Sequence, residues 1–263
     1  MIPKSHIVQW QQYAPWQDFA QVEQDLIISR TLVAIFSDDI LRSQLAFRGG
    51  TALHKLFCNP APRYSEDIDL VQIHPGPIKP IIHRLGEVID FFDEPRSTKN
   101  RGHGVKAIHR FTSSFESIPL RLKIEINCRE HFQVLDWAEI PFKIENDWFS
   151  GETTLRTYQL SELLGTKLRA LFQRKKGRDL FDLDYSRRLN PINEQEVLSC
   201  FKKYIEYSTE KSAPTQKQFI QNMESKFNDP MFHGDMEGIL RTGISYDPHE
   251  AFEWLIHSLI SQL

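Results

Sequence analysis

Two segments decide the predicted fold of this chain: Phe47-Arg48-Gly49-Gly50-Thr51 and Asp67-Ile68-Asp69-Leu70. The first ends a short apolar run at a glycine pair and continues into a helical pattern, which predicts a strand, a turn and a helix. The second alternates acidic and apolar residues, which predicts a strand with both aspartates on one face. Adjacent carboxylates on a sheet repel each other unless a cation lies between them. The two segments therefore predict an α/β fold with a cation-binding strand.

A divalent metal ion suits such a carboxylate pair, because Mg²⁺ prefers carboxylate oxygens and commonly binds substrate phosphates as well. The backbone N–H groups of Gly49, Gly50 and Thr51 at the start of a helix form a cradle for an anion. Ser65 either hydrogen-bonds near the phosphates or caps a turn. Asp-x-Asp alone more often marks a surface strand, and Gly-Gly alone a turn. Together they predict a site for phosphoryl or nucleotidyl transfer.

A third carboxylate is expected from a neighbouring strand. The segment 120–127 alternates most regularly in the sequence, with Leu122 and Ile124 on one face and Lys123 and Glu125 on the other. By itself this pattern is typical of an amphipathic strand with a solvated face. Beside the aspartate pair, Glu125 becomes the candidate third metal ligand or the general base that activates an attacking hydroxyl.

The remaining pattern predicts how the chain is organised. Strands mixed with helices are expected over residues 1–150 and a mostly helical part over 151–263, with helices at 161–176, 178–189, 192–207, 215–227 and 248–263. Residues 99–104 are expected to form a loop. His103 and His109, which flank a possible hairpin, are expected on the surface.

Composition sets limits on the class of protein. The chain has 263 residues, of which 40% are hydrophobic and 25% charged, as in ordinary globular proteins. It carries neither an apolar segment long enough to span a bilayer nor a signal-peptide pattern near its start, so we expect a cytoplasmic protein. The overall charge of −3 contrasts with residues 156–188, where nine Lys/Arg against four Asp/Glu make +5. That segment is a candidate anion site.

Phe47-Arg48-Gly49-Gly50-Thr51-Ala52-Leu53 and Arg63-Tyr64-Ser65-Glu66-Asp67-Ile68-Asp69-Leu70 resemble motifs of the DNA polymerase beta-like nucleotidyltransferase superfamily. They are most similar to those of the AbiEii/AbiGii toxin family, the nucleotidyltransferase half of bacterial toxin–antitoxin and phage-defence pairs. The resemblance implies a nucleotidyltransferase palm over residues 1–150, with Asp67, Asp69 and Glu125 binding Mg²⁺ or Mn²⁺. It also implies an NTP substrate and a cognate antitoxin as partner. The lack of an apolar segment of bilayer-spanning length predicts no association with a membrane.

A second motif carries the same resemblance. Leu163-Leu164-Gly165-Thr166-Lys167 runs on to Arg178-Asp179-Leu180-Phe181-Asp182, which is similar to the lysine helix and Arg-Asp-x-x-Asp of the family. The resemblance implies that Lys167 contacts nucleotide phosphates and that Asp179 is needed for activity. Arg174 lies seven residues after Lys167, so it shares that helix face and is a further candidate nucleotide ligand. Taken alone, the motif would fit an exposed basic helix followed by an acidic helix start.

Three functions stay open from the sequence. The first is transfer of an NMP from an NTP to an acceptor hydroxyl, which is either a tRNA 3′ end or a protein side chain. The second is the same chemistry on a small molecule such as an antibiotic. The third is a non-catalytic NTP-binding module.

Overall fold

The computed structural model describes residues 2–102 and 104–263, and its chain divides into two compact units. The sheet unit runs to Gln133 and resumes over Trp137–Tyr158, and the helical unit consists of Val134–Asp136 and Gln159–Leu263. The sheet unit continues to Tyr158 rather than ending at residue 150, because strand β7 (Gly151–Thr157) pairs with the sheet.

The sheet unit is built on a mixed sheet of seven strands in the order β3-β4-β5-β2-β1-β7-β6. The pairs β2–β5 and β1–β7 are parallel and the others antiparallel. Besides β7, the strands are β1 (Leu45–Arg48), β2 (Asp67–Gln72), β3 (Ser97–Arg101), β4 (Gly104–Thr112), β5 (Pro119–Asn127) and β6 (Ala138–Ile144). The α/β class predicted from the sequence is confirmed.

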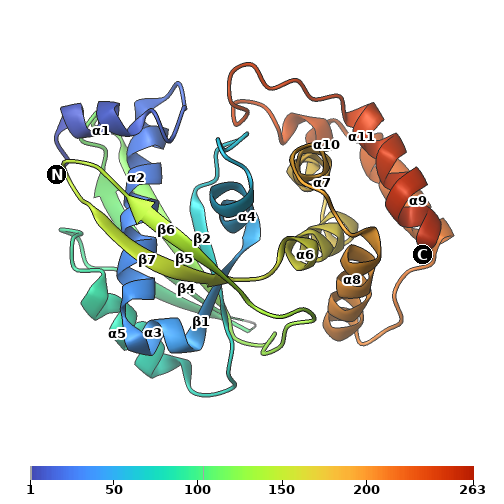
Figure 1. Ribbon diagram of the computed structural model, residues 1–263, viewed down its shortest axis with the longest axis horizontal. Helices are drawn as coiled ribbons and strands as arrows, with labels where there is room; N and C mark the ends of the chain where they lie inside the picture. The colour runs from blue at the N-terminus through green and yellow to red at the C-terminus, as the bar shows by residue number, and fades with distance from the viewer. Residues whose placement is uncertain (1, 103) are drawn as a thin grey trace. The chain divides into compact units, whose positions relative to one another are not determined.

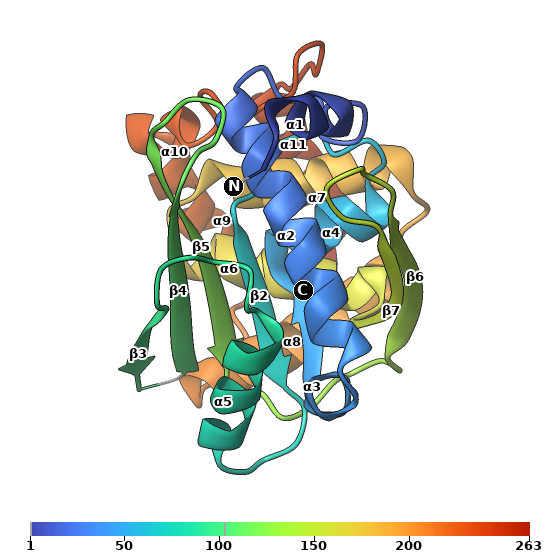
Figure 2. The same cartoon turned by 90° about the vertical axis from the view of Figure 1, so that its left-hand side faces the viewer.

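Helices cover both faces of this sheet. Figures 1 and 2 show α2 against one face and α4 on the opposite face. The helices of the unit are α1 (Lys4–Trp10), α2 (Phe19–Ser37), α3 (Asp39–Gln44), α4 (Gly49–Phe57) and α5 (Ile78–Val88). Asp18 caps α2 by accepting a hydrogen bond from the N–H of Ala20. Because α2 lies over the sheet with other helices around it, it is buried on nearly all sides.

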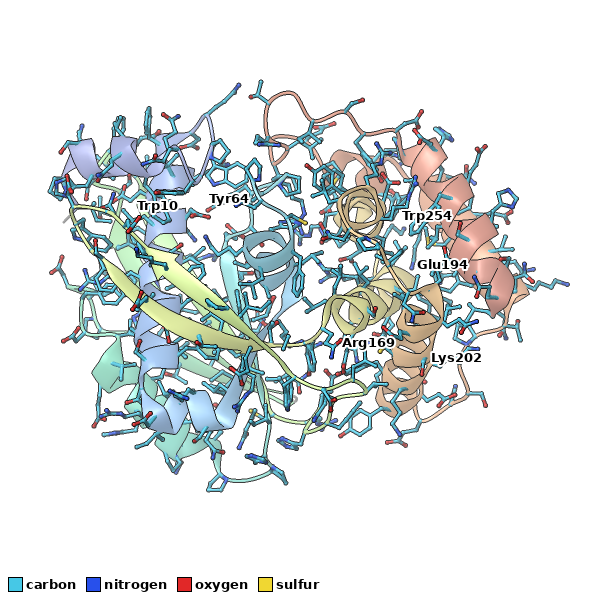
Figure 3. The ribbon with its side chains drawn as sticks, in the orientation of Figure 1. Trp10, Tyr64, Arg169, Glu194, Lys202 and Trp254 are labelled. Carbon is cyan, nitrogen blue, oxygen red and sulfur yellow. The ribbon has the colours of Figure 1, made fainter. Side chains whose placement is uncertain are left out.

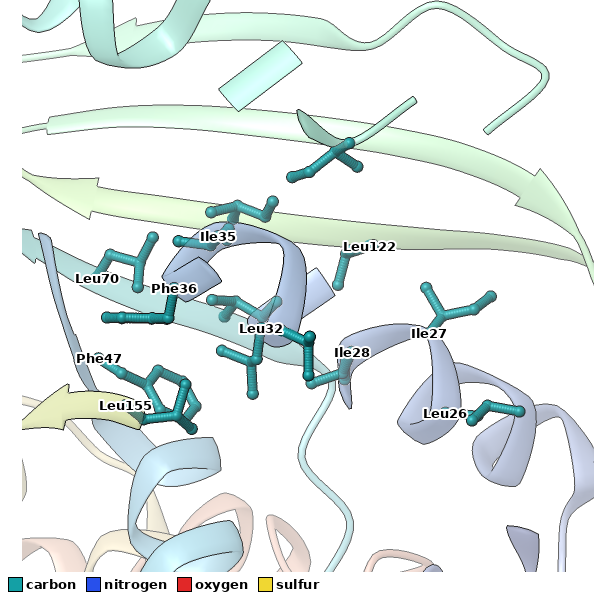
Figure 4. Packing of buried hydrophobic residues seen from close by; sticks show 14 of the residues in the cluster. Leu26, Ile27, Ile28, Leu32, Ile35, Phe36, Phe47, Leu70, Leu122 and Leu155 are labelled. Carbon is teal, nitrogen blue, oxygen red and sulfur yellow. The ribbon is translucent and has the colours of Figure 1, made fainter. Parts of the chain in front are cut away.

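The core of the sheet unit lies between α2 and the sheet. Side chains of α2, including Ile28, Leu32 and Phe36, pack against Leu70 and Leu122 from two neighbouring strands (Figure 4). A second buried contact joins α2 to α1 and α4, because Asp25 accepts hydrogen bonds from Trp10, labelled in Figure 3, and from Lys55. These contacts fix α1 and α4 to α2.

Two expectations about the hairpin at the sheet edge are wrong. Residues 97–101 form β3 rather than a loop, since they pair with β4 in the register Lys99 to Lys106. An edge strand needs no buried face, so its polar sequence lacks the alternation that marks a strand. His109 is buried, at 2% exposure, because its side chain falls on the core face of β4 and packs against Phe92. His103 lies outside the described residues.

The helical unit contains α6 (Leu160–Gln173), α7 (Gly177–Leu189), α8 (Glu194–Thr209), α9 (Gln216–Phe227), α10 (Pro230–Gly234) and α11 (Pro248–Trp254), followed by a π-turn over Leu255–Leu259 and a 3₁₀ turn over Ile260–Gln262. Gly165 allows α6 to approach α8 closely, because a Cβ there would meet Cys200 at 2.6 Å. The guanidinium of Arg169, labelled in Figure 3, belongs to α6. It lies over the ring of Tyr204 from α8. In the described part of the chain, every helix is too short or too polar to cross a bilayer.

Candidate active site

Strands β2 and β5 bring the three predicted carboxylates onto one face of the sheet. In the parallel register, Asp67 lies opposite Lys123 and Asp69 opposite Glu125. These four side chains are partly exposed, whereas the alternate residues Ile68, Leu70, Leu122, Ile124 and Ile126 are buried in the core. Period-2 alternation therefore places Asp67, Asp69 and Glu125 together on the face that carries α4.

Gly49 sets the approach of α4 to this acidic face. It has φ of +80°, and a Cβ at this position would overlap the Asp69 carboxylate. Only glycine combines that backbone conformation with so close a contact. The first N–H groups of α4, from Gly49, Gly50 and Thr51, have no partner within the helix by its geometry. Backbone donors and carboxylate acceptors therefore lie next to each other, as expected for a metal–phosphate site.

Thr51 and Ser65 join the start of α4 to the start of β2. The Thr51 hydroxyl lies 2.8 Å from Ser65 Oγ and donates to the backbone oxygen of Asp67 at 2.5 Å. The Thr51 side chain is buried at 2% exposure. These contacts hold Asp67 beside the first turn of the helix. The roles predicted for Thr51 and Ser65 in phosphate binding stay predictions.

Two lysines, which the sequence reasoning left without a role, lie among the carboxylates. Lys123 Nζ is 2.5 Å from Asp67 Oδ2 and 3.1 Å from Glu125 Oε1. Lys106 Nζ, from β4, is 2.7 Å from the same Glu125 oxygen. The alternation of β5 puts Lys123 on the face of Glu125 and could have indicated it. Lys106 could not have been found in this way, because the local sequence pattern does not show that its strand, β4, pairs with β5.

The pKa values of Asp67 and Glu125, two carboxylates of the same face, are shifted in opposite directions. Burial raises the pKa of Asp67 to about 6, with the negative charges of Asp69 and Glu66 adding to the effect and Lys123 opposing it. Burial also acts to raise the pKa of Glu125, but hydrogen bonds from Lys106 and Lys123 bring it below its ordinary value. Asp67 therefore carries a negative charge that its surroundings do not fully compensate, and a cation of higher charge than the Lys123 ammonium would stabilise it.

The donor set fits a hard divalent cation. Asp67, Asp69 and Glu125 offer only carboxylate oxygens, which Mg²⁺ and Mn²⁺ accept as ligands. Among the described residues, no three His, Cys, Asp or Glu side chains are already arranged around one point as a metal site. At this face the bridging position between Asp67 and Glu125 is taken by the Lys123 ammonium.

The second predicted set of residues forms a cluster inside the helical unit. Lys167 Nζ, on α6, lies 3.3 Å from Asp179 Oδ1 and 2.7 Å from Asp182 Oδ2, both on α7. Arg174 also donates to both carboxylate oxygens of Asp179. Burial acts to raise the pKa of Asp179, but Lys167 and Arg174 lower it overall. The roles predicted for Lys167, Arg174 and Asp179 in nucleotide binding and activity stay predictions.

Comparisons with known proteins identify the family and the fold. The model of a family described as nucleotidyl transferase AbiEii toxin, type IV toxin–antitoxin system, matches residues 30–258. MenT4, a nucleotidyltransferase toxin from Mycobacterium tuberculosis, is similar in structure with a TM-score of 0.73 at 16% identity, covering 100% of this chain and 91% of that one. JHP933 from Helicobacter pylori is similar with a TM-score of 0.53 at 18% identity, covering 92% of this chain and 94% of that one. No curated protein matches significantly.

Proposed function

The chain belongs to the nucleotidyl transferase AbiEii toxin family, and on this premise we propose that it uses a divalent metal ion to transfer an NMP from an NTP to an RNA hydroxyl. It is a nucleotidyltransferase toxin of a type IV toxin–antitoxin system, with an NTP as substrate and a cognate antitoxin as partner. Of these features, the metal dependence and the RNA acceptor are our proposals.

The observation that carries the metal dependence is the set of three carboxylates on one sheet face beside the start of α4. Asp67 and Asp69 would hold Mg²⁺ or Mn²⁺, and Glu125 would complete the ligand set. The low pKa of Glu125 favours this role over that of a general base, because a carboxylate held ionised by two lysines is a weak proton acceptor. When bound, the metal would neutralise charge on the phosphates. Backbone N–H groups of Gly49 and Gly50 would orient phosphate oxygens.

Two arginines on the same face support a polyanionic acceptor. Arg110 and Arg121 lie directly opposite each other on β4 and β5, on the face that carries Lys123 and Glu125. Both are exposed and line a cavity of about 460 Å³ together with two acids, Asp18 and Glu66, the residue before Asp67. Like charges opposite each other weaken a sheet. An RNA phosphate near the acceptor end would compensate them, which favours a tRNA 3′ end over a protein side chain.

Transfer of label from each α-labelled NTP to total tRNA or to total protein, in the presence of Mg²⁺, tests the proposal. We expect label in the tRNA fraction and its loss, by about 100-fold or more, in Asp69→Asn, which removes one negatively charged ligand without changing side-chain size. Asp39→Asn, at a side chain with 96% exposure, is the matched control and should keep the wild-type rate. Transfer by Asp69→Asn at that rate would refute the metal assignment.

The acceptor assignment has its own test. The double variant Arg110→Gln/Arg121→Gln should bind tRNA more weakly. The slope of log K for tRNA binding against the logarithm of the salt concentration should become shallower by about one for each phosphate that the variant no longer neutralises. Arg42→Gln, which removes a cation from α3 instead, is the control and should leave both quantities unchanged. Label in protein rather than tRNA, or an unchanged salt slope in the double variant, would contradict an RNA acceptor.

A further inference from the structure

We infer that Lys123 is the resident counter-cation of the carboxylate face and that a divalent metal ion must displace it, so that Lys123 sets the metal affinity of the site. This inference rests on the proposed function, because it concerns the same three carboxylates.

The geometry places a single ammonium where a metal ion would bridge two strands. Lys123 Nζ contacts Asp67 Oδ2 at 2.5 Å and Glu125 Oε1 at 3.1 Å, so one group joins β2 to β5. A metal ion held by Asp67 and Glu125 would lie within a few ångströms of the Lys123 ammonium. Because two cations at that distance repel each other strongly, binding of the metal would favour departure of the ammonium.

The exposure of the cluster makes the exchange feasible. The side chains of Lys123, Asp67 and Glu125 are 24%, 29% and 29% exposed. A lysine ammonium is a point charge on a flexible stem, so it can move into solvent without a shift of the backbone. Lys106 differs, since it contacts Glu125 at 2.7 Å and has no contact with Asp67 among the described residues. Lys106 is therefore the matched control within the same cluster.

The inference predicts opposite effects in the two states of the protein. Without metal, Lys123 offsets repulsion among Asp67, Asp69 and Glu125, so its removal should destabilise the sheet unit. With metal, the divalent cation takes over that task, and the same removal relieves competition. A lysine that only stabilised the fold would have the same effect in both states.

Binding of Mn²⁺ alone, measured by electron paramagnetic resonance on the full-length chain without NTP, tests the inference. Lys123→Met should bind Mn²⁺ about tenfold or more tightly than the wild type, and Lys106→Met should gain clearly less. Lys123→Arg should bind Mn²⁺ more weakly than the wild type, because a guanidinium holds carboxylates in a bidentate pair. In thermal unfolding, Lys123→Met should have a lower Tm than the wild type in EDTA and a larger upward shift of Tm on adding Mn²⁺.

Four results would count against it. If Lys123→Met binds Mn²⁺ no more tightly than the wild type, Lys123 does not compete with the metal. If Lys123→Met fails to fold, Lys123→Arg decides, and Mn²⁺ affinity equal to or above that of the wild type overturns the inference. If neither the wild type nor any variant binds Mn²⁺, the proposed metal dependence fails as well. If the wild type binds Mn²⁺, Asp69→Asn abolishes that binding and Lys123→Met leaves it unchanged, the inference about Lys123 fails but the proposed metal dependence stands.

Discussion

Lys123 in the sheet unit and Lys167 in the helical unit each contact two carboxylates, but the two clusters differ in their exposure to solvent. The Lys123 side chain is 24% exposed and its partners Asp67 and Glu125 are each 29% exposed. The Lys167 side chain is 8% exposed, and Asp179 and Asp182 are fully buried. Because solvent can replace the partner of a charged group only where it has access, we expect the Lys123 ion pairs to be exchangeable and the Lys167 ion pairs to be structural.

The physical basis is the cost of an unpaired charge. In a partly exposed cluster, water and salt compensate a carboxylate whose lysine has left, so each pair contributes little to stability. In a buried cluster, the charge that remains has lost its solvation, and removal of its partner is strongly destabilising. We therefore expect variants of the helical cluster to act on folding and variants of the sheet cluster to act on ligand binding.

The largest effect is expected from Lys167→Met. Asp179 and Asp182 would stay buried without the ammonium that both contact, and the free energy of unfolding should fall by about 3–5 kcal/mol. Urea denaturation measures this loss. Lys203→Met, at an exposed position of α8, is the control, and its free energy of unfolding should stay within about 0.5 kcal/mol of the wild-type value. If Lys167→Met is as stable as the wild type but has lost NMP transfer, Lys167 acts on the substrate. That result would refute the expected difference between the two clusters.

His109 adds a third arrangement, a buried titratable group whose Nε2 has no hydrogen-bond partner within the described residues. Burial, followed by the positive charge of Arg96, lowers the pKa of His109 from 6.5 to about 4. Asp90, Asp93 and Glu94 line the cavity that His109 shares with Arg96.

Since the unfolded chain takes up the proton first, the stability that His109 contributes should be complete above pH 6.5. It should be lost as the pH falls towards 4, by about 3 kcal/mol. Unfolding of wild type and His109→Gln at several pH values measures this, and equal pH dependence in both would refute it.

The smallest effect that we expect is a difference in stability between two alanine variants, one of them at Gly49, beside the partly exposed carboxylate cluster. Gly49→Ala meets both a left-handed backbone and the Asp69 carboxylate, whereas Gly238→Ala has φ of +73° and open space. Both variants should lose about 1–2 kcal/mol to the backbone conformation. Gly49→Ala should lose a further 1–3 kcal/mol, roughly, to the overlap. Equal losses in the two variants, measured by urea denaturation, would mean that Asp69 moves aside freely.

Particular residues show how far sequence reasoning reached. Alternation placed Asp67 and Asp69 on one face, and it placed Lys123 beside Glu125, because the side-chain period of a strand is a local property. The helix over Phe19–Ser37 was also predictable from its apolar spacing. The edge strand β3 was missed, since its polar residues are stabilised by pairing with β4 rather than by burial. His109 was misplaced because its polar side chain was taken as a surface residue, although Val105 and Ala107, which share its face of β4, are apolar and buried.

Local pattern is enough to show which side chains of β2 and of β5 share a face, and that Gly49 and Gly50 begin a helix. The pairing of β5 with β2, which puts Asp69 opposite Glu125, and the bridge from Lys123 to Asp67 and Glu125 appear only in the folded chain. The physical reason is that a strand's faces follow from its own covalent geometry. The register between strands distant in sequence follows from long-range packing, here of Leu70 and Leu122 against α2.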